Sequence, residues 1–324
     1  MTSKKPVAVF AFPHPWMQEM INRVAPEEFE VLFLDIKNEE EAHKLLPRAD
    51  FLIGFALPGK YVPLLQNCKL VQAQGVGYDN IDTEALNKAG IPFAITPEGT
   101  ITGVAEHIIL FILALYKQLV QVHESLREGK YDGMGWRANS HFFCGKTLGI
   151  VGMGRVGQRV SQLVRGFEVN LIYYDVLRLP ETLEQELCAT YTPFEELLSQ
   201  SDIISVHTPL TAETRGLFGP GEYAQMKSGA LFINTSRGET YDMDALCESL
   251  ISGHLGGAGL DVFNPEPPPP DHPILGLPNV ICTPHMATGT IEAHLIKAQE
   301  HFDNFFRVLQ GEEPHNLIVP ATQD

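Results

Sequence analysis

The chain lacks any block of lysines and arginines that could follow a nucleic-acid backbone. Lysine plus arginine number 23 against 40 aspartates plus glutamates, so the formal net charge of the 324 residues is -17. Without a basic track we expect no nucleic-acid partner. The same negative field disfavours anionic ligands, so an anion site in this chain must depend on local hydrogen-bond donors.

Paired cysteines and metal-ligand spacings are also missing. The five cysteines are scattered, odd in number and contain no CxxC pair: Cys68, Cys144, Cys188, Cys247 and Cys282. They predict free thiols in a reducing compartment and no metal site. The N-terminal stretch "MTSKKPVAVFAF" has a short apolar run interrupted by Pro6 and no cleavage signal, so we expect a cytoplasmic protein.

No apolar run is long enough for an uninterrupted membrane span. The most apolar segment, residues 103–120, carries Glu106, His107 and Lys117, whereas a bilayer span needs roughly 20 predominantly apolar residues. Apolar residues recur at steps of three and four from Val104 to Leu126, which predicts one long, buried helix and no membrane anchor.

Short apolar, β-branched runs alternate with helical stretches along almost the whole chain. Expected strands begin at Val7, Val31, Asp50, Leu70 and Pro92, and then at Thr147, Asn170, Asp202, Ala230, Gly257 and Val280. This pattern predicts an α/β fold with two doubly wound parallel-sheet domains. Residues 290–311 read as a helix closed by Gly311. If that helix packs on the first sheet, the first domain is discontinuous, with residues 1–101 plus 292–324, and the second covers 102–291.

A glycine-rich turn follows the first strand of the second series. Gly152, Gly154 and Gly157 form a GxGxxG pattern between a strand and a helix, which is typical of dinucleotide-binding domains. The next strand ends at Asp175, 23 positions after Gly152, where a carboxylate binds ribose hydroxyls and repels a 2′-phosphate. NAD is therefore favoured over NADP, although Arg178 keeps NADP open. A tight turn without a ligand is the alternative.

Three polar residues follow neighbouring strands of the second series. Arg237, Glu266 and His285 each lie just beyond a predicted strand end, and ligands of open parallel sheets bind outside those ends. Each also has a structural interpretation: a local ion pair, a solvated loop acid and a helix cap, respectively. His207, also at a strand end, is the rival acid/base residue.

Six ordered motifs make the chain resemble the D-isomer-specific 2-hydroxyacid dehydrogenases. They are "GVGYDNID" at Gly75, "VAEH" at Val104, "GKTLGIVGMGRVGQ" at Gly145, "INTSRGE" at Ile233, "GLDVFNPEP" at Gly259 and "TPHMATGT" at Thr283. The resemblance implies a flavodoxin-like substrate domain and a Rossmann NAD-binding domain. It also implies a homodimer built on the cofactor domain, with the helix from Val104 embracing the partner.

The resemblance places the catalytic residues at Arg237, Glu266 and His285. Reduction of a 2-keto acid needs a proton on the carbonyl oxygen, which a protonated imidazole at His285 can donate near neutral pH. Glu266 would hold the other ring nitrogen and favour the charged form. Arg237 would bind the carboxylate and polarise the keto group.

Further ligand contacts follow from the same resemblance. Backbone N–H groups of Gly75, Val76 and Gly77 can form an anion-binding concavity for the substrate carboxylate, on a loop from the other domain, so the site is expected in a cleft that closes. The remaining cofactor contacts are implied at two places: Arg155 and Val156 at the pyrophosphate, and Thr208, Thr235 and Asp261 near the nicotinamide.

The expected function is NAD(H)-dependent interconversion of a small 2-keto acid and its D-2-hydroxy acid. The chain ends at Asp324 without the regulatory domain of the long phosphoglycerate dehydrogenases, which favours an unphosphorylated substrate such as glyoxylate or hydroxypyruvate. The proline-rich "PEPPPP" from Pro265 departs from the family pattern, as does Asn264, where an acid is often found. A dinucleotide-sensing binding protein of the C-terminal-binding corepressor type is the main alternative. A metal-dependent hydrolase is a weaker one.

Overall fold

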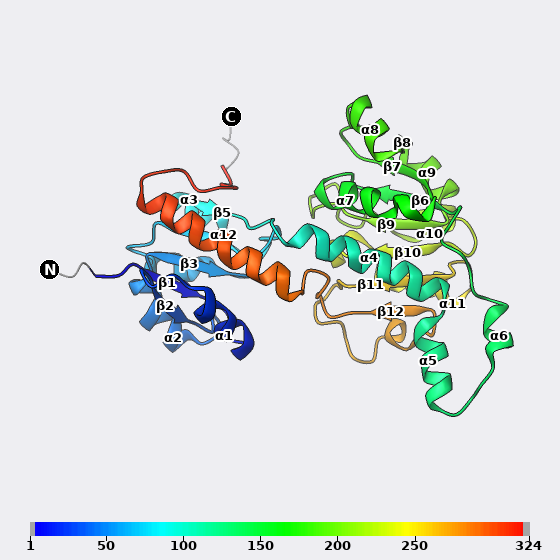
Figure 1. Cartoon of the computed structure of the whole chain (residues 1–324), viewed down its shortest axis with the longest axis horizontal. Helices are drawn as coiled ribbons and strands as arrows, with labels where there is room; N and C mark the ends of the chain where they lie inside the picture. Colours follow the sequence, from blue (N-terminus) through cyan, green and yellow to red (C-terminus); the bar gives the residue numbers. More distant parts are fainter. Residues whose placement is uncertain (1–3, 320–324) are drawn as a thin grey trace. The chain divides into compact units, whose positions relative to one another are not determined.

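The computed structural model describes residues 4–319 (Figure 1). The chain divides into two compact units, one formed by residues 1–100 with 289–324 and the other by residues 101–288. Each unit is built around a single sheet whose strands are all parallel. The predicted fold class, α/β with two doubly wound parallel-sheet domains, is confirmed.

The first unit has a five-stranded sheet in the order β2-β1-β3-β4-β5. Its strands are β1 (Val7–Phe10), β2 (Glu30–Phe33), β3 (Phe51–Gly54), β4 (Leu70–Ala73) and β5 (Phe93–Ala94). Its helices are α1 (Pro15–Val24), α2 (Glu39–Leu45), α3 (Thr83–Lys88) and α12 (Ile291–Leu309), with 3₁₀ turns η1 (Leu46–Arg48) and η2 (Gly59–Leu64). All five strands expected in this part of the chain are present. Strands β1, β3 and β4 are buried along their whole length, as expected for a sheet covered on both faces.

Helix α12 joins this sheet from the far end of the sequence. The side chain of Thr290 caps its first turn by accepting a hydrogen bond from the backbone N–H of Ala293, and Gly311 follows it with a φ of +79°. The ring of Phe305 stacks on that of Phe51 in β3, with centroids 4.3 Å apart. The helix predicted for residues 290–311 is confirmed, and Figure 1 shows it running along the sheet of the first unit.

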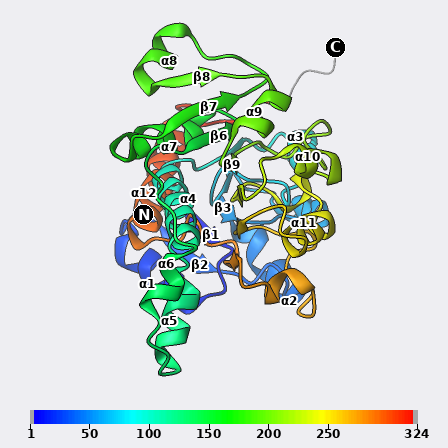
Figure 2. The ribbon, with the colours of Figure 1, turned by 90° about the vertical axis from the view of Figure 1, so that its right-hand side faces the viewer.

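The second unit has a seven-stranded sheet in the order β12-β11-β10-β9-β6-β7-β8. Its strands are β6 (Thr147–Val151), β7 (Asn170–Tyr174), β8 (Ala189–Tyr191), β9 (Ile203–Val206), β10 (Leu231–Asn234), β11 (Gly257–Leu260) and β12 (Val280–Cys282). Six of these match the expected strands. The seventh, β8, lies with its preceding helix at one edge of the sheet (Figure 2). It was missed because three residues are too few to show a strand period.

Helices cover both faces of this second sheet. The helices of the unit are α4 (Thr100–Tyr116), α5 (Leu119–Arg127), α6 (Gly133–Arg137), α7 (Arg155–Leu163), α8 (Glu181–Leu187), α9 (Phe194–Gln200), α10 (Pro220–Gln225) and α11 (Met243–Ile251), with 3₁₀ turns η3 (Val164–Phe167), η4 (Gly238–Thr240) and η5 (Pro273–Gly276). Of these, α5 and α6 bury no residue. Two buried clusters fill the two sides of the sheet. One centres on Phe218, Phe232 and Leu246, and the other contains Ile108 and Phe111 of α4.

The single long helix predicted from Val104 to Leu126 is wrong. Helices α4 and α5 meet at an angle of 59°, because Gln118 adopts a left-handed conformation with a φ of +50° that ends the first helix. Only α4 is buried against the sheet, whereas α5 buries no residue. Spacing at three and four residues continues across the break, so the apolar pattern does not reveal it. Within residues 4–319 no single helix is long and apolar enough to cross a membrane, although this bent pair passes that test by length and composition.

Candidate active site and cofactor-binding face

The three glycines in the turn between β6 and α7 differ in how much space surrounds them. Gly152 has a φ of +96°, and a Cβ there would lie 2.9 Å from the carbonyl carbon of His207. A Cβ at Gly157 would lie 2.7 Å from the carbonyl oxygen of Gly152. Gly154 has open space where a Cβ would be. The turn is therefore tight, packed against the sheet and open on the side that a pyrophosphate approaches.

The open side of this turn coincides with the start of α7. Gly154 is the N-cap of the helix, and Arg155 and Val156 are its first two residues. Their backbone N–H groups have no acceptor within the helix, and the helix dipole adds partial positive charge there. An anion bound at this end would be held by donors that do not depend on the net charge of the protein.

Asp175 lies directly after β7 and is fixed beside the glycine-rich turn. Its Oδ2 accepts a hydrogen bond from the backbone N–H of Met153 at 2.7 Å, and its Oδ1 accepts one from the backbone N–H of Leu177 at 3.1 Å. The two bonds hold the carboxylate in one orientation next to the turn. This is the position at which an acid meets the ribose hydroxyls in dinucleotide-binding domains.

Buried polar atoms without partners gather at the carboxyl ends of β9 and β10. Among the described residues, His207 Nε2, Thr208 Oγ1 and Thr235 Oγ1 are buried and have no hydrogen-bond partner. Such atoms are costly unless a ligand satisfies them, and the amide and ribose groups of a dinucleotide offer the necessary donors and acceptors. The residues present therefore fit NAD. Burial also lowers the pKa of His207 to about 3, so this rival imidazole is neutral at pH 7 and a poor proton donor.

His285 and Glu266 form the closest pair among the expected catalytic residues. Their side chains meet with 2.8 Å between His285 Nδ1 and Glu266 Oε1, and both remain partly exposed. The hydrogen bond to Glu266 raises the pKa of His285, with the negative charges of Glu266 and Asp261 acting in the same direction. The backbone of His285 has a φ of +50°. For a residue with a Cβ this conformation is uncommon, and such outliers concentrate at functional sites.

Asp261 holds the loop that carries His285. Its buried carboxylate accepts hydrogen bonds, each 2.8 Å long, from the backbone N–H groups of the two residues that follow His285. It also accepts one from the hydroxyl of Thr283, which in turn meets Nε2 of His107 at 3.0 Å. Burial lowers the pKa of His107. His107 belongs to the "VAEH" motif, but no role was predicted for it, because this residue of α4 joins the network only through the fold. The cofactor contact expected of Asp261 remains a prediction.

Arg237 follows β10 and lies close enough to His285 for its charge to act on the imidazole. Its Nη1 donates a hydrogen bond to the carbonyl oxygen of Ser236 at 2.7 Å, and its positive charge acts to lower the pKa of His285. The side chain of Asn234 organises this turn, since its Oδ1 accepts from the backbone N–H of Ser236 at 2.8 Å and its Nδ2 donates to Thr240 Oγ1 at 3.0 Å. Asn234 is fully buried, and sequence reasoning missed its role.

A glycine brings the turn of Arg237 against the segment that leads to Glu266. A Cβ at Gly238 would lie 1.9 Å from the carbonyl oxygen of Phe263, a distance that no side chain tolerates. The hydroxyl of Tyr241 crosses the same interface and donates to the carbonyl oxygen of Val262 at 3.0 Å. All three expected catalytic residues thus follow the carboxyl ends of adjacent parallel strands of the second sheet, β10, β11 and β12.

The expected substrate loop belongs to the first unit and follows β4. The carbonyl oxygen of Gly75 accepts a hydrogen bond from the backbone N–H of Thr96 at 3.0 Å, and Val76 is exposed. The preceding Gln74 is held by the buried His301, whose Nε2 lies 2.8 Å from Gln74 Oε1. The carboxylate-binding role of Gly75, Val76 and Gly77 remains a prediction. In the part of the chain that the structure describes, no three His, Cys, Asp or Glu residues are placed to hold a metal ion.

Comparison with known proteins identifies the family. Residues 109–287 match the family model of the D-isomer specific 2-hydroxyacid dehydrogenase, NAD binding domain. A glyoxylate reductase of Korarchaeum cryptofilum is 39% identical over 77% of this chain and 76% of its own length. A hydroxypyruvate reductase of Thermotoga maritima is 34% identical over 87% of this chain and 92% of its own length.

Solved structures agree with this relationship. The NAD-dependent formate dehydrogenase of Staphylococcus aureus, solved in complex with NAD, superposes with a TM-score of 0.83 and 30% identity, covering 98% of this chain and 99% of that one. The similarity therefore extends over both units. The chain belongs to the D-isomer-specific 2-hydroxyacid dehydrogenase family and is an NAD-dependent oxidoreductase.

Proposed function

We propose that the protein reduces a small 2-keto acid to the D-2-hydroxy acid, and catalyses the reverse oxidation, with His285 as general acid/base. The pairing of His285 Nδ1 with Glu266 Oε1 at 2.8 Å supports this role most directly. A histidine paired in this way keeps its other ring nitrogen, Nε2, for the substrate. The pKa of His285 is raised by the hydrogen bond to Glu266, which favours the imidazolium form that a proton donor to a carbonyl oxygen requires.

When bound, NADH supplies the hydride that reduces the carbonyl carbon. His285 Nε2 gives its proton to the keto oxygen as negative charge develops there, and Glu266 stabilises the imidazolium before the transfer. In the oxidation direction the neutral imidazole accepts the hydroxyl proton, and Glu266 stabilises the cation that forms. Arg237 is positioned by the Asn234 turn to bind the substrate carboxylate and polarise the keto group.

We assign the units of the chain to the two ligands. Residues 102–291 form the cofactor domain in this proposal, and residues 1–101 plus 292–324 form the substrate domain. Backbone N–H groups of Gly75, Val76 and Gly77 bind the substrate carboxylate. Backbone N–H groups can bind a carboxylate even in a protein of net negative charge, because they attract the anion locally.

The proposed cofactor contacts are at the glycine-rich turn and the neighbouring strand ends of the second unit. Gly154, Arg155 and Val156 bind the pyrophosphate at the start of α7, and Gly152 and Gly157 shape the turn that receives it. Asp175 binds the adenosine ribose and disfavours NADP. Thr208, Thr235 and Asp261 lie on the nicotinamide side, where the unpartnered hydroxyls of the two threonines support this assignment.

The names of the relatives indicate the substrate class. Proteins named glyoxylate reductase and hydroxypyruvate reductase are 34–39% identical to this chain, so we propose glyoxylate or hydroxypyruvate as the preferred keto acid. Both are small and unphosphorylated. The test is NADH oxidation with glyoxylate, hydroxypyruvate, pyruvate, phenylpyruvate and 2-ketoisocaproate. Preference for the larger, branched or aromatic acids would contradict this substrate class.

A dinucleotide-sensing binding protein would behave differently in the same experiment. It would bind NADH without turning over any of the keto acids. Calorimetric titration of NADH in parallel with the activity measurements separates the two functions. Binding without turnover would overturn the enzymatic proposal and favour the corepressor type.

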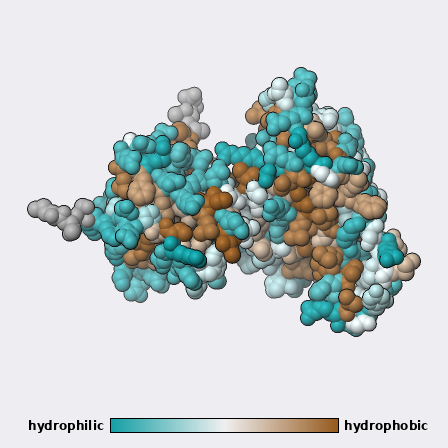
Figure 3. All heavy atoms as spheres, in the orientation of Figure 1, coloured by the Kyte–Doolittle hydropathy of each residue, from teal (hydrophilic) through white to brown (hydrophobic). Residues whose placement is uncertain are grey.

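We further propose that the protein is a homodimer through the face that carries α4 and α5. Large apolar side chains are exposed there, and Figure 3 shows hydrophobic residues gathered over this face of the second unit. They are Leu110, Leu119, Val120 and Leu126. Exposed apolar side chains gathered on one face are typical of an interface. Sedimentation equilibrium of the whole chain tests the proposal, and Leu119→Glu with Leu126→Glu should shift a dimer to the monomer mass.

A further inference from the structure

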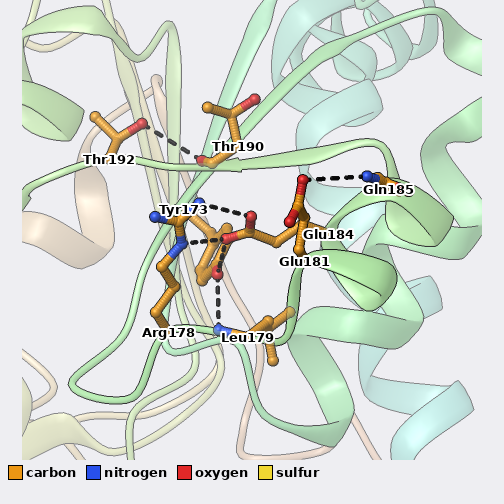
Figure 4. A network of polar contacts seen from close by, with 8 residues as sticks. All are labelled: Tyr173, Arg178, Leu179, Glu181, Glu184, Gln185, Thr190 and Thr192. Carbon is orange, nitrogen blue, oxygen red and sulfur yellow. Dashed lines mark hydrogen bonds and ion pairs between the residues drawn. The ribbon is translucent and has the colours of Figure 1, made fainter.

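Arg178, three residues after Asp175, is bound to a single carboxylate through one edge of its guanidinium group. Its Nε donates to Glu184 Oε1 and its Nη2 donates to Glu184 Oε2, both at 2.9 Å. Figure 4 shows this two-pronged pair between the loop after β7 and helix α8. Its guanidinium carbon also lies 5.5 Å from the centroid of the Tyr191 ring in β8. The orientation of Arg178 is therefore set by α8 and β8.

Glu184 is itself fixed from the other side. It is buried, and its Oε1 accepts a second hydrogen bond, from the hydroxyl of Tyr173, at 2.7 Å. The two hydrogen-bonding partners lower the pKa of Glu184 to about 2, with Arg178 contributing most. Removing Arg178 from this position would leave a buried carboxylate without its counter-charge, which is unfavourable.

The same short loop carries both charges that bear on the choice of cofactor. At one end Asp175 is tied to the glycine-rich turn through the backbone N–H of Met153. At the other end the backbone N–H of Leu179 donates to the hydroxyl of Tyr173 at 2.9 Å. The loop thus presents a carboxylate at the turn while its guanidinium is bound to α8.

If the guanidinium of Arg178 were not paired with Glu184, it could bind a phosphate group of the cofactor. Arginine binds phosphate groups in a two-pronged manner with the same nitrogen atoms that now face Glu184. An NADP-binding site commonly places an arginine near the ribose 2′-phosphate. Here Nε and Nη2 are bound to the carboxylate of Glu184, which also pairs with the positive charge.

We propose that Glu184 is a residue that determines cofactor specificity, because it holds Arg178 away from the position that a ribose 2′-phosphate would occupy. The inference rests on the proposed binding of the adenosine ribose at Asp175. Discrimination against NADP then has two parts: Asp175 repels the 2′-phosphate, and Glu184 withholds the arginine that would otherwise bind it. Glu184 touches neither substrate nor cofactor, so it acts as a positioning residue.

The test measures the Kd of NADPH and of NADH by isothermal titration calorimetry, without substrate. The comparison is made in an Asp175→Asn background, where repulsion by the acid no longer masks the arginine. Adding Glu184→Gln should tighten NADPH binding about tenfold and leave the Kd of NADH within about twofold. Adding Arg178→Met to that pair should abolish the gain.

Glu181→Gln is the matched control, because it removes one negative charge from the same helix. Its exposed side chain accepts a hydrogen bond from Gln185 and none from Arg178. Equal tightening of NADPH by the two glutamine variants would show a general charge effect and overturn the proposal. An unchanged Kd of NADPH with Glu184→Gln would also overturn it.

Two further measurements distinguish a wrong assignment of the ribose site from a wrong role for Glu184. If Asp175→Asn alone leaves the Kd of both cofactors unchanged, the assignment of the ribose site is wrong. If Asp175→Asn changes the Kd of a cofactor but adding Glu184→Gln does not change it further, only the role of Glu184 is refuted. If thermal unfolding shows that Glu184→Gln does not fold, Glu184→Asp takes its place. It keeps the charge but withdraws the carboxylate, and a gain in NADPH binding smaller than tenfold is expected. An unchanged Kd of NADPH with that variant would refute the role of Glu184.

Discussion

Nδ1 of His285 lies 2.8 Å from Oε1 of Glu266, and the backbone that carries the imidazole is held in a left-handed conformation by the loop bonded to Asp261. The glutamate approaches the ring from the segment after β11, and the histidine follows β12. The pair is therefore built by two adjacent strand ends of one sheet, a favourable arrangement for the proposed proton donor, which would have to meet a carbonyl oxygen in a fixed direction.

Removing the charge of Glu266 should shift the pH dependence of catalysis. The hydrogen bond to Glu266 raises the pKa of His285, so reduction, which needs the protonated ring, persists to higher pH than an ordinary histidine would allow. With Glu266→Gln the pKa falls, and the basic limb of kcat/KM for reduction moves to lower pH. Oxidation needs the neutral ring, so its acidic limb also moves to lower pH. We expect a loss of about 10²-fold in reduction at pH 7.5.

The pH profiles of both directions, measured for wild type and Glu266→Gln, test this expectation. Glu239→Gln serves as a control, because it removes an acid from the neighbouring η4 turn. A Glu266→Gln profile with unshifted limbs and reduced height would contradict the proposed electrostatic role.

Gly238→Ala should disable the site without touching any ligand. The new Cβ would lie 1.9 Å from the carbonyl oxygen of Phe263, so the turn of Arg237 must move away from the segment that carries Glu266. A displacement of about 1 Å at a reacting group costs on the order of 10²-fold in rate. We expect that loss in kcat/KM, together with a lower melting temperature.

Gly221→Ala is the control for this substitution. Gly221 lies within α10, and a Cβ there meets no atom within 4 Å. Alanine is favoured over glycine in a helix by about 1 kcal/mol, so this variant should keep full activity and unfold at a slightly higher temperature. Similar behaviour of the two alanine variants would show that the close approach at Gly238 does not position Arg237.

Thr283→Val should loosen the loop of His285. The substitution keeps the shape of the side chain but removes the hydroxyl between Asp261 and His107. Loss of a hydrogen bond to a charged group costs about 1.5–3 kcal/mol of the free energy of unfolding. Chemical denaturation measures this cost, and Thr283→Ser, which restores the hydroxyl, should recover most of it. A valine variant as stable as wild type would show that the hydroxyl does not anchor the loop.

Acid should destabilise the first unit through His301. Burial lowers the pKa of His301 to about 3, and the positive charge of Lys297 acts in the same direction. Between that value and about 6.5, the pKa of an unfolded histidine, the unfolded chain binds the extra proton. The stability from the neutral ring is therefore complete above pH 6.5 and is lost as pH falls toward 3, by at most about 1.4 kcal/mol per pH unit.

Denaturant unfolding at several pH values between 4 and 7.5 tests this dependence. His301→Gln should reduce the proton uptake on unfolding by about one in the acid range, whereas His43→Gln, at an exposed position of α2, should leave it unchanged. An unaltered slope with His301→Gln would contradict the account.

Local patterns in the sequence were sufficient for most of the fold. Buried parallel strands are short apolar runs, and all eleven expected ones are present, as is the helix closed by Gly311. The errors have physical reasons. The left-handed Gln118 breaks a helix without breaking its apolar spacing, and β8 is too short to show a period.

The candidate site could be predicted only in part. Arg237, Glu266 and His285 follow strand ends and belong to motifs, so the sequence could single them out as candidates. Residues that position them were missed, because their partners are distant in the sequence. His107 meets Thr283 across 176 positions, and the close approach at Gly238 involves a segment from the next strand end. Arg178 and Glu184 are only six positions apart, but their pairing depends on how the loop after β7 meets α8, which the sequence pattern does not show.

The central claim, protonation of a 2-keto acid by His285 during hydride transfer, is tested most directly by a single-turnover experiment. Enzyme saturated with NADH is mixed with glyoxylate or hydroxypyruvate, and absorbance at 340 nm is followed for wild type, His285→Gln and the control His43→Gln. The account predicts that the rate of NADH oxidation falls about 10²- to 10⁴-fold with His285→Gln, that the Kd of NADH changes less than about twofold, and that His43→Gln behaves as wild type. A His285→Gln enzyme that oxidises NADH at the wild-type rate would contradict it.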